Sequence, residues 1–264
     1  MRPPVPPPPP PHPDPRCFGK VSKDAKRVEF QPCVHDGPCS NDNDCPCLLS
    51  GNLCEKYCAC GRDCAQRFKG CVCELGGCVT KSCPCRAGSR ECDPDLCGSC
   101  GASVPPVFLD EAEKAADGAA LCCNTQMRRR RAARTAVGRS DIHGWGLFAL
   151  EHINKGDFVI EYAGEIITQD EADRRGHIYD KQHMNFLFAT NEDLVIDSTR
   201  QGSRSKFAND PKGQRSTPNC EARVTSINCD HRVGFFATED LAPGTEITFE
   251  YGDAFTPLNK GKKN

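Results

Sequence analysis

The sequence has no long hydrophobic run, although 38% of its 264 residues are hydrophobic. A membrane-spanning helix needs about 20 consecutive apolar residues, so this class of protein is excluded and no membrane partner is expected. The sequence also has no excess of one charge. Its 34 Lys and Arg residues face 36 Asp and Glu residues and leave a net charge of -2, so the chain as a whole is not a polycation.

The N-terminus lacks the apolar segment of a secretory signal peptide. Ten of its first fifteen residues are proline instead, and proline-rich segments adopt extended polyproline II structure without a core. We therefore expect residues 1–16 to form a disordered arm, either a solvated tail or a ligand for a proline-recognition domain. Without a secretory signal, the thiols of the chain are expected to stay in a reducing compartment.

Most catalytic sequence templates are also missing. The chain contains no G-x-S-x-G, no P-loop and no H-E-x-x-H. Gly144, Trp145 and Gly146 do not form a dinucleotide fingerprint, because no G-x-G-x-x-G follows a strand and opens a helix. The corresponding hydrolases, nucleotide-binding enzymes and metalloproteases are therefore not indicated.

Cysteine is abundant and unevenly placed: 21 residues in total, of which sixteen lie between Cys33 and Cys100. Such density indicates either disulfides or metal, and the absence of a secretory signal favours metal, with a secreted disulfide scaffold as the weaker alternative. Both halves of this region place a Cys-Pro-Cys step six residues before the next cysteine. The first unit comprises Cys33, His35, Cys39, Cys45, Cys47, Cys54, Cys58, Cys60 and Cys64. The second comprises Cys71, Cys73, Cys78, Cys83, Cys85, Cys92, Cys97 and Cys100.

The ligand count suggests clusters of structural zinc, since sulfur-rich tetrahedral sites favour this ion. Nine ligands can hold three tetrahedral ions if three of the ligands bridge, and the first unit offers nine. The second offers eight, so its ninth ligand is open between Cys122 and Cys123, with Asp93 or Asp95 less favoured. We predict six zinc ions in total, supporting a region too small to have its own apolar core.

Residues 102–137 resemble a linker, and their second part is rich in arginine. The arginines in its central run are Arg128, Arg129, Arg130, Arg131 and Arg134. The run is either a solvated helix face, a contact with the DNA backbone or with the acidic surface of a nucleosome, or a nuclear localisation signal. The cysteine region itself is a poor candidate for duplex binding, because residues 33–100 carry seven basic and nine acidic residues.

From residue 138 the pattern changes to short alternating runs separated by Gly and Pro, which is typical of a β-rich α+β fold. Strands are predicted within residues 144–150, 157–167, 186–190, 194–198, 220–228, 232–237 and 246–251. The capping box from Thr168 to Glu171 predicts one helix that continues to about Tyr179.

Two resemblances emerge from these segments. CEKYCACGRDCAQRFKGCVC and KSCPCRAGSRECDPDLCGSCG are similar to the CXC domain. HGWGLFA, YAGEIITQDEADRRG, FAND, TPNCEARV, DHRVGFFA and GTEITFEYGDAF resemble a SET domain. This order is typical of Enhancer of zeste, the catalytic subunit of Polycomb repressive complex 2. The resemblance implies a CXC domain built on two tri-zinc clusters at residues 17–101, a SET domain (a β-clip with a pseudoknot) at 138–252, and a basic tail at 253–264.

The family resemblance also implies a function. Its members transfer a methyl group from S-adenosylmethionine to a histone H3 lysine, lysine-27, in Polycomb gene silencing in the nucleus. They act on nucleosomes together with a WD40 subunit and a VEFS-domain subunit. By resemblance, Gly144, Trp145 and Gly146 form a backbone ledge under the cofactor, Asn209 and Asp210 form part of its wall, and Tyr251 is the catalytic tyrosine. Separately, the aromatic candidates for the lysine channel or the core are Phe186, Phe207 and Phe249.

The sequence departs from the family at three places. Asp210 and Pro211 stand where the family has His-Ser, and a short insertion, PKGQR, begins at Pro211. Gln182 replaces the tyrosine of animal relatives, which leaves the number of methyl groups transferred open. Cys220 has no C-terminal cysteines with which to form a post-SET zinc site, so Cys220 and Cys229 are expected to be ordinary thiols. If Asp210 and the insertion impair the cofactor wall, the alternative is a catalytically impaired SET protein that acts as a zinc-cluster chromatin-binding module.

Overall fold

The structure is a computed structural model that describes residues 30–40, 43–104, 121–182, 184–191, 193–212 and 217–251. The predicted N-terminal arm, the basic tail, the acidic part of the linker and most of the PKGQR insertion lie outside these residues. Within them, no helix has both the length and the apolar character needed to cross a membrane.

In the described part of the chain, nine strands form three small antiparallel sheets. The first contains β1 (Thr135–Arg139), β2 (Trp145–Ala149) and β9 (Glu246–Ile247), in the order β1-β2-β9. The second contains β3 (Phe158–Tyr162), β8 (Asp230–Ala237) and β7 (Cys220–Ile227), in the order β3-β8-β7. The third contains β4 (Gly164–Thr168), β6 (Leu194–Gly202) and β5 (Leu187–Ala189), in the order β4-β6-β5. The β-rich fold class predicted from the alternating pattern is thus confirmed.

The three sheets share one apolar core, built from the inward-facing residues of the alternating runs. Leu147 of β2, Val159 of β3 and Phe235 of β8 are completely buried within it. Phe249 joins the same cluster from beyond β9, and its ring centroid lies 4.4 Å from that of Phe235. The C-terminal segment therefore enters the centre of the domain.

Helix α4 (Gln169–Lys181), the one long helix among the described residues, confirms the prediction from the capping box. The Thr168 hydroxyl accepts a hydrogen bond from the backbone N–H of Glu171 at 3.4 Å, which satisfies one free N–H of the first turn. Farther along, Arg175 and the Tyr179 hydroxyl both bind the buried Asp197 carboxylate of β6, each at 2.9 Å. These contacts attach α4 to the third sheet.

The C-terminal segment crosses two earlier segments, as expected for the pseudoknot. Asn209 pairs with Thr248 in parallel bridge geometry, and Cys220 pairs in the same way with Phe249. The Phe249 N–H donates to the Asn209 carbonyl at 3.0 Å, and the Cys220 N–H donates to the Thr248 carbonyl at 2.9 Å. The segment between β9 and Tyr251 is therefore held on both sides by backbone hydrogen bonds.

The cysteine-rich region has little regular structure. Its two short helices, α1 (Pro46–Leu49) and α2 (Pro84–Ala87), each begin inside a Cys-Pro-Cys step, where proline suits the first helical turn. Its two buried clusters consist mainly of cysteine side chains, with Phe68 and Ala102 as additions in the second. Sulfur therefore replaces the apolar core that a region of this size lacks.

The structure differs from the sequence analysis at two places. The described part of the arginine-rich segment, residues 121–134, forms turns and irregular backbone and contains no helix. Strand β1, which begins at Thr135, was not predicted. It pairs along its whole length with β2, so that Arg139 lies opposite Trp145.

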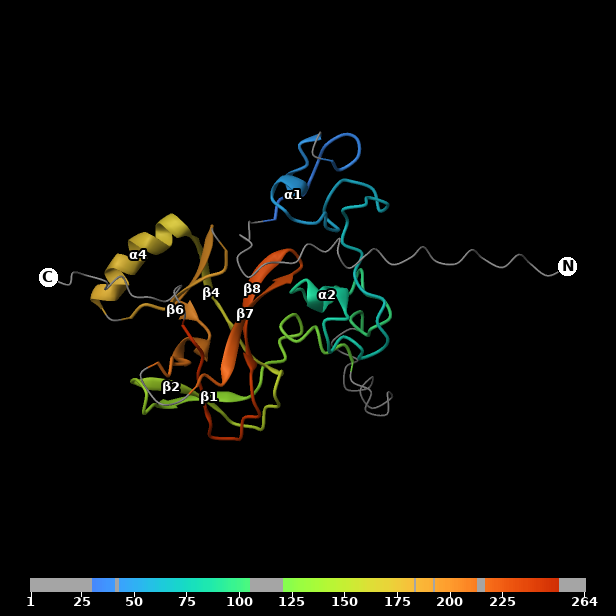
Figure 1. The fold of residues 1–264 in the computed structure, drawn as a ribbon. Helices are drawn as coiled ribbons and strands as arrows, with labels where there is room; N and C mark the ends of the chain where they lie inside the picture. Colours follow the sequence, from blue (N-terminus) through green and yellow to red (C-terminus); the bar gives the residue numbers. More distant parts are fainter. Residues whose placement is uncertain are drawn as a thin grey trace.

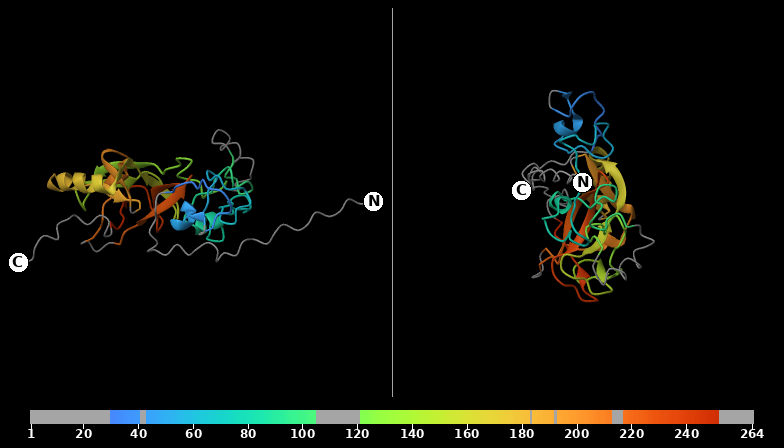
Figure 2. Two further views of the ribbon diagram at one scale, coloured as in Figure 1. Left: turned by 90° about the horizontal axis from the view of Figure 1, so that it is seen from above. Right: turned by 90° about the vertical axis from the view of Figure 1, so that its right-hand side faces the viewer.

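The cysteine-rich region docks beside the long β7–β8 hairpin (Figure 1). The backbone of Ser226 at the hairpin tip accepts from Glu91 at 3.1 Å and donates to Ser89 at 2.9 Å. Figure 2 shows the resulting arrangement, with α4 and the cysteine-rich region at opposite ends of the molecule.

Candidate functional site

The first cysteine unit gathers its sulfur atoms into overlapping groups. Cys33 belongs to three sets of four ligand atoms that all lie within 4.8 Å of one another. His35 joins one of these sets, together with Cys39 and Cys45. A sulfur atom shared among sets is what a bridging thiolate requires. The ligand set predicted from spacing is therefore brought together in space.

The distances between the sulfur atoms fit a tetrahedral metal and exclude disulfides. Cys33 and Cys39 are separated by 3.8 Å, Cys33 and Cys54 by 3.9 Å, and Cys47 and Cys58 by 3.6 Å. A disulfide needs about 2.05 Å. Two ligands of a tetrahedral zinc ion with Zn–S bonds of about 2.3 Å lie about 3.8 Å apart, which is the spacing found here.

The second unit shows the same geometry and identifies its missing ligand. Cys71 lies 3.8 Å from both Cys78 and Cys92, sulfur to sulfur. The Cys122 thiol contacts those of Cys92, Cys100 and Cys78, so it faces the cluster. The neighbouring Cys123 thiol instead donates to the backbone carbonyl of Cys78 at 3.5 Å.

The two acidic alternatives for the ninth ligand have other partners. Asp93 and Asp95 both pair with the ammonium group of Lys56, at 2.9 Å for Asp93. Asp93 also lies 3.4 Å from the Arg128 guanidinium. Among the described residues, Cys122 is therefore the best candidate for the ninth ligand.

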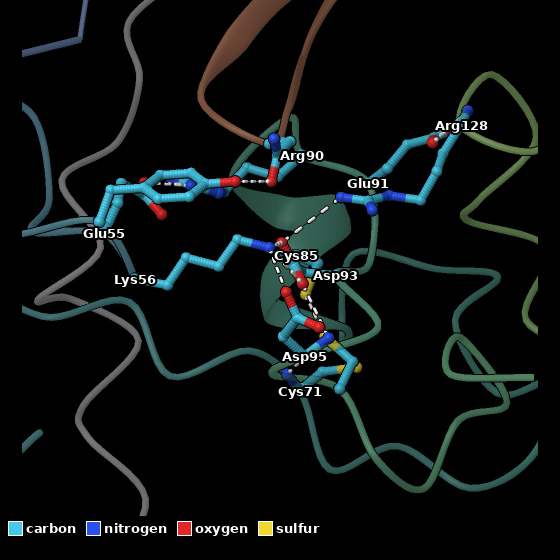
Figure 3. Close-up of polar contacts among 12 residues, drawn as sticks. Glu55, Lys56, Cys71, Cys85, Arg90, Glu91, Asp93, Asp95 and Arg128 are labelled. Carbon is cyan, nitrogen blue, oxygen red and sulfur yellow. Dashed lines mark hydrogen bonds and ion pairs between the residues drawn. The ribbon is translucent and has the colours of Figure 1, made fainter.

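A polar network joins the two cysteine units to the strand-rich domain (Figure 3). Lys56 of the first unit reaches the two aspartates of the second, and Arg90 pairs with Glu55 across the same boundary. The buried carboxylate of Glu91 accepts the backbone N–H groups of Met127 and Arg128, at 2.8 and 2.9 Å. Because Met127 is buried against Phe158 and Ile227, these bonds fix the cysteine-rich region on the sheet domain.

Part of the arginine run is engaged in contacts within the protein, although Arg130, Arg131 and Arg134 are exposed. Arg128 pairs with Asp93, Arg129 donates to the carbonyl of Gly101 at 2.8 Å, and Arg134 pairs with Glu151 at 2.7 Å. The run is therefore no uniform basic stripe on the surface. A contact between these arginines and DNA stays a prediction.

The predicted cofactor ledge is organised by the side chain of Asn209. Its amide nitrogen lies 3.0 Å from the Trp145 carbonyl, 3.3 Å from the His143 carbonyl and 2.9 Å from Glu246 Oε1. Asn209 itself is buried, so its amide holds the turn that carries the ledge against the C-terminal segment. The structure thus brings Asn209 and the ledge together from positions 64 residues apart.

The two glycines of the ledge are required for different reasons. Gly144 has a φ of +51° and no atom within 4 Å of an added Cβ, so its turn presents open backbone. At Gly146 a Cβ would lie 2.5 Å from Glu246 Oε1. Trp145 between them is half exposed and stacks on the Arg139 guanidinium, 4.4 Å from the ring centroid. Open backbone beside an exposed aromatic ring fits the approach of a cofactor.

Tyr251 lies on the C-terminal segment, two residues after Phe249, which pairs with Cys220 in the pseudoknot. Its hydroxyl donates to the Ala208 carbonyl at 3.0 Å, and its backbone N–H donates to the Asp210 carboxylate at 3.1 Å. Burial, reinforced by the charge of Asp210, raises the pKa of Tyr251 to about 12. The phenol is therefore neutral at physiological pH, and it can orient a partner but is not ionised to act as a base.

The aromatic candidates divide between core and site. Phe249 is buried and packs on both Phe235 and Tyr251, the latter with 4.9 Å between ring centroids. Phe186 and Phe207 are half-buried and meet edge to face at 6.3 Å. The ammonium of Lys206 lies over both of these rings, 5.4 and 5.6 Å from their centroids. This contact was not predicted, because it depends on the turn of the short 3-10 helix η4 (Arg204–Phe207).

The remaining residues singled out from the sequence are accounted for by their surroundings. Gln182 is the exposed C-cap of α4. Cys220 is buried in the core, and burial raises its pKa to about 12. Burial likewise raises the pKa of Cys229 to about 12. Both thiols are therefore protonated near neutral pH and unreactive as nucleophiles.

Comparisons with known proteins agree with this architecture. The CXC domain family matches residues 70–102, and the SET domain family matches residues 144–252. Histone-lysine N-methyltransferase EZ3 of Zea mays is 42% identical over 224 residues, which cover 85% of this chain and 24% of that protein. The chain thus spans about a quarter of the length of the curated relatives it matches.

Two solved structures of the Chaetomium thermophilum complex ctPRC2 are also similar. One, in an autoinhibited conformation bound to S-adenosylmethionine, has a TM-score of 0.78 and 35% identity and covers 88% of this chain and 30% of that chain. The other, in complex with H3K27me3 and H3K27M, has a TM-score of 0.77 and 35% identity and covers 89% and 29%.

The fold, the sulfur clusters and the matched families define the class: a CXC domain followed by a SET domain. Relatives that are 40–42% identical over most of this chain narrow the class further. Over these two domains the chain is of the Enhancer of zeste type.

Proposed function

We propose that this chain is the catalytic part of a histone methyltransferase that transfers a methyl group from S-adenosylmethionine to a lysine of histone H3. One observation supports this above all. The pseudoknot joins the glycine ledge, Asn209 and Tyr251 into one site, although the ledge and the tyrosine lie more than a hundred residues apart in sequence. The similar ctPRC2 structures, bound to S-adenosylmethionine in one case and to H3K27M in another, support the cofactor and favour lysine-27 as the target.

S-adenosylmethionine, when bound, supplies a methyl group activated by the neighbouring sulfonium charge. We assign the contact with it to the backbone of Gly144, Trp145 and Gly146 and to the wall formed by Asn209 and Asp210. Tyr251 orients the acceptor lysine, whose amine must be neutral and whose unperturbed pKa is about 10.4. Desolvation of the amine in the channel and the adjacent sulfonium charge both disfavour the ammonium, and so favour the neutral amine. Positioning accounts for much of the remaining catalysis.

We further propose that the cysteine units hold six structural zinc ions, three in each unit, with Cys122 as the ninth ligand of the second. The shared sulfur atoms and the tetrahedral spacing support this assignment. With nine ligands for three tetrahedral ions, each proposed cluster has no open coordination position for a substrate. The role of the zinc ions is therefore to support the cysteine-rich region, which docks on β7 and β8.

The family resemblance and the similar ctPRC2 structures also suggest partners and a location. We propose that the chain works in the nucleus within a Polycomb repressive complex that contains the WD40 and VEFS-domain subunits, and that the complex modifies nucleosomes and silences genes.

The second candidate, a catalytically impaired chromatin-binding module, rests on Asp210 in place of histidine. It is not favoured, because both Asp210 carboxylate oxygens have hydrogen-bond partners in the site and neither disturbs the Asn209 network.

The test is mass spectrometry of histone H3 after incubation of nucleosomes with the zinc-loaded chain, assembled with its Polycomb subunits. Methylation confined to lysine-27 is expected, and the spectrum also gives the number of methyl groups. A Tyr251→Phe chain that binds S-adenosylmethionine normally in calorimetry is the matched control and should show strongly reduced transfer. If the wild-type assembly neither binds the cofactor nor modifies histone H3, the chromatin-binding module replaces this proposal.

A further inference from the structure

Asp210 stands where the family has histidine, and the structure shows what its carboxylate does. One oxygen accepts the backbone N–H of Lys212 at 2.8 Å, which closes a local turn around the buried Pro211. The other accepts the backbone N–H of Tyr251 at 3.1 Å, from a segment 41 residues away. The residue thus ties a turn of the cofactor wall to the segment that carries the candidate catalytic tyrosine.

Tyr251 is held at two points by the same short segment. Its hydroxyl donates to Ala208 and its N–H donates to Asp210, so phenol and backbone are anchored two residues apart. The Phe249 N–H adds a third bond, to the Asn209 carbonyl. We propose that Asp210 is a positioning residue, whose carboxylate sets the place of Tyr251 relative to the cofactor ledge, and that it is no defect in a cofactor wall.

A histidine at this position could not provide the same contacts. A neutral imidazole has one acceptor nitrogen, whereas a carboxylate has two oxygens and serves two N–H groups at once. A hydrogen bond to a charged acceptor is also about twice as strong as a neutral one. Aspartate therefore suits the sequence that follows it here, because Asp-Pro-Lys forms a turn that needs its own acceptor.

The charge of Asp210 has a second effect on the tyrosine. It reinforces burial in raising the pKa of Tyr251, so the phenol stays protonated and continues to donate to the Ala208 carbonyl. Geometry and electrostatics then act together, since the carboxylate that places the backbone of Tyr251 also carries the charge that disfavours ionisation of its phenol.

This inference rests on the proposed methyl transfer, and its test separates the two. Asp210→Ala, Asp210→Asn and wild-type chains are each assembled with the Polycomb subunits. Turnover on histone H3, cofactor affinity by calorimetry and thermal unfolding are measured for each. Asp240→Ala is the matched control, because Asp240 also accepts a backbone N–H, that of Lys155 at 2.8 Å, on the exposed surface.

Asp210→Ala should lower kcat by about 10- to 100-fold, the equivalent of a lost charge-assisted hydrogen bond, and should lower cofactor affinity by a smaller factor, because both carboxylate oxygens are occupied by N–H groups of the protein. Asp210→Asn keeps one acceptor and should give an intermediate kcat. Its Tyr251 phenol should ionise at a lower pH than in the wild type, which absorbance titration against Tyr251→Phe detects. Asp240→Ala should match the wild type.

Several results would overturn the inference while leaving methyl transfer intact. These are a wild-type kcat in Asp210→Ala, a cofactor affinity that falls as much as kcat, or a Tyr251 titration unchanged in Asp210→Asn. If neither Asp210 variant folds, the role of Asp210 is structural, and the inference is rejected as well. An inactive wild-type assembly would instead reject the proposed function itself.

Discussion

Replacing Gly146 with alanine should damage the ledge through one specific collision. The added Cβ would lie 2.5 Å from Glu246 Oε1, 2.8 Å from Glu246 Cδ and 3.0 Å from Ser140 Cβ. The carboxylate cannot move away freely, because it accepts the Ser140 hydroxyl at 2.7 Å and the Asn209 amide at 2.9 Å. Relief of the collision therefore has to break part of the Asn209 network.

The magnitude follows from the cost of overpacking a tightly packed site, about 1–3 kcal/mol. If this strain falls on the conformation that binds cofactor, affinity for S-adenosylmethionine should drop by about 5- to 100-fold. Gly144→Ala is the contrasting variant, since its Cβ meets no atom within 4 Å and only the positive φ is strained. It should lower stability without disturbing Glu246.

The assay is a double-mutant cycle with Glu246→Ala, read by calorimetry and by thermal unfolding. Because Glu246→Ala removes the colliding group, Gly146→Ala should cost little more in its background, so the two effects should be far from additive. Additive losses, or a Gly146→Ala chain with wild-type affinity and melting temperature, would show that the collision does not control the ledge.

Three further expectations concern the metal, the phenol and the junction. Cys33→Ser should remove all three zinc ions proposed for the first unit, because its sulfur is shared among ligand sets. Cys123→Ser should retain the full metal content, and elemental analysis measures both variants. Loss of a single zinc ion from Cys33→Ser would contradict a shared sulfur. Because the pKa of Tyr251 is raised to about 12, kcat should rise with pH as the substrate amine loses its proton, with no fall from phenol ionisation near the ordinary tyrosine value of about 10. A decline centred there and absent from Tyr251→Phe would refute this. Glu91→Ala should lower the free energy of unfolding by about 2–5 kcal/mol, since it strips two backbone N–H groups of their acceptor, while the exposed Glu74→Ala changes it little in denaturant titrations.

Local patterns predicted the parts of the fold that depend on local causes. The capping box at Thr168 located α4, and alternation located seven segments that overlap eight of the nine strands of the described residues, because both signals reside in neighbouring residues. The run at 157–167 forms two strands, β3 and β4, which lie in different sheets. Strand β1 was missed, since AARTAVGR has no clear alternation of its own and forms a strand through pairing with β2. The arginines before it were open to a helical interpretation for the same lack of a local signal.

The candidate site shows the same division between local and distant causes. Spacing identified the metal-ligand candidates, yet it could not choose between Cys122 and Cys123, because adjacent residues differ only in the direction of their side chains. Asp210 was interpreted as a weakening of the cofactor wall, since its partner Tyr251 is distant in sequence. Contacts that form where distant segments of the chain cross cannot be predicted from local sequence patterns.

Threading of the C-terminal segment delays assembly of the site until the whole domain has been synthesised. The ribosome releases the glycine ledge and Asn209 long before Thr248 and Phe249, whose pairing closes the crossing. A nascent chain that lacks this segment can hold both sulfur clusters and still lack the pairing that fixes the C-terminal segment beside Asn209. Synthesis of this segment is thus the last step in assembling the crossing that holds Tyr251 beside Asp210.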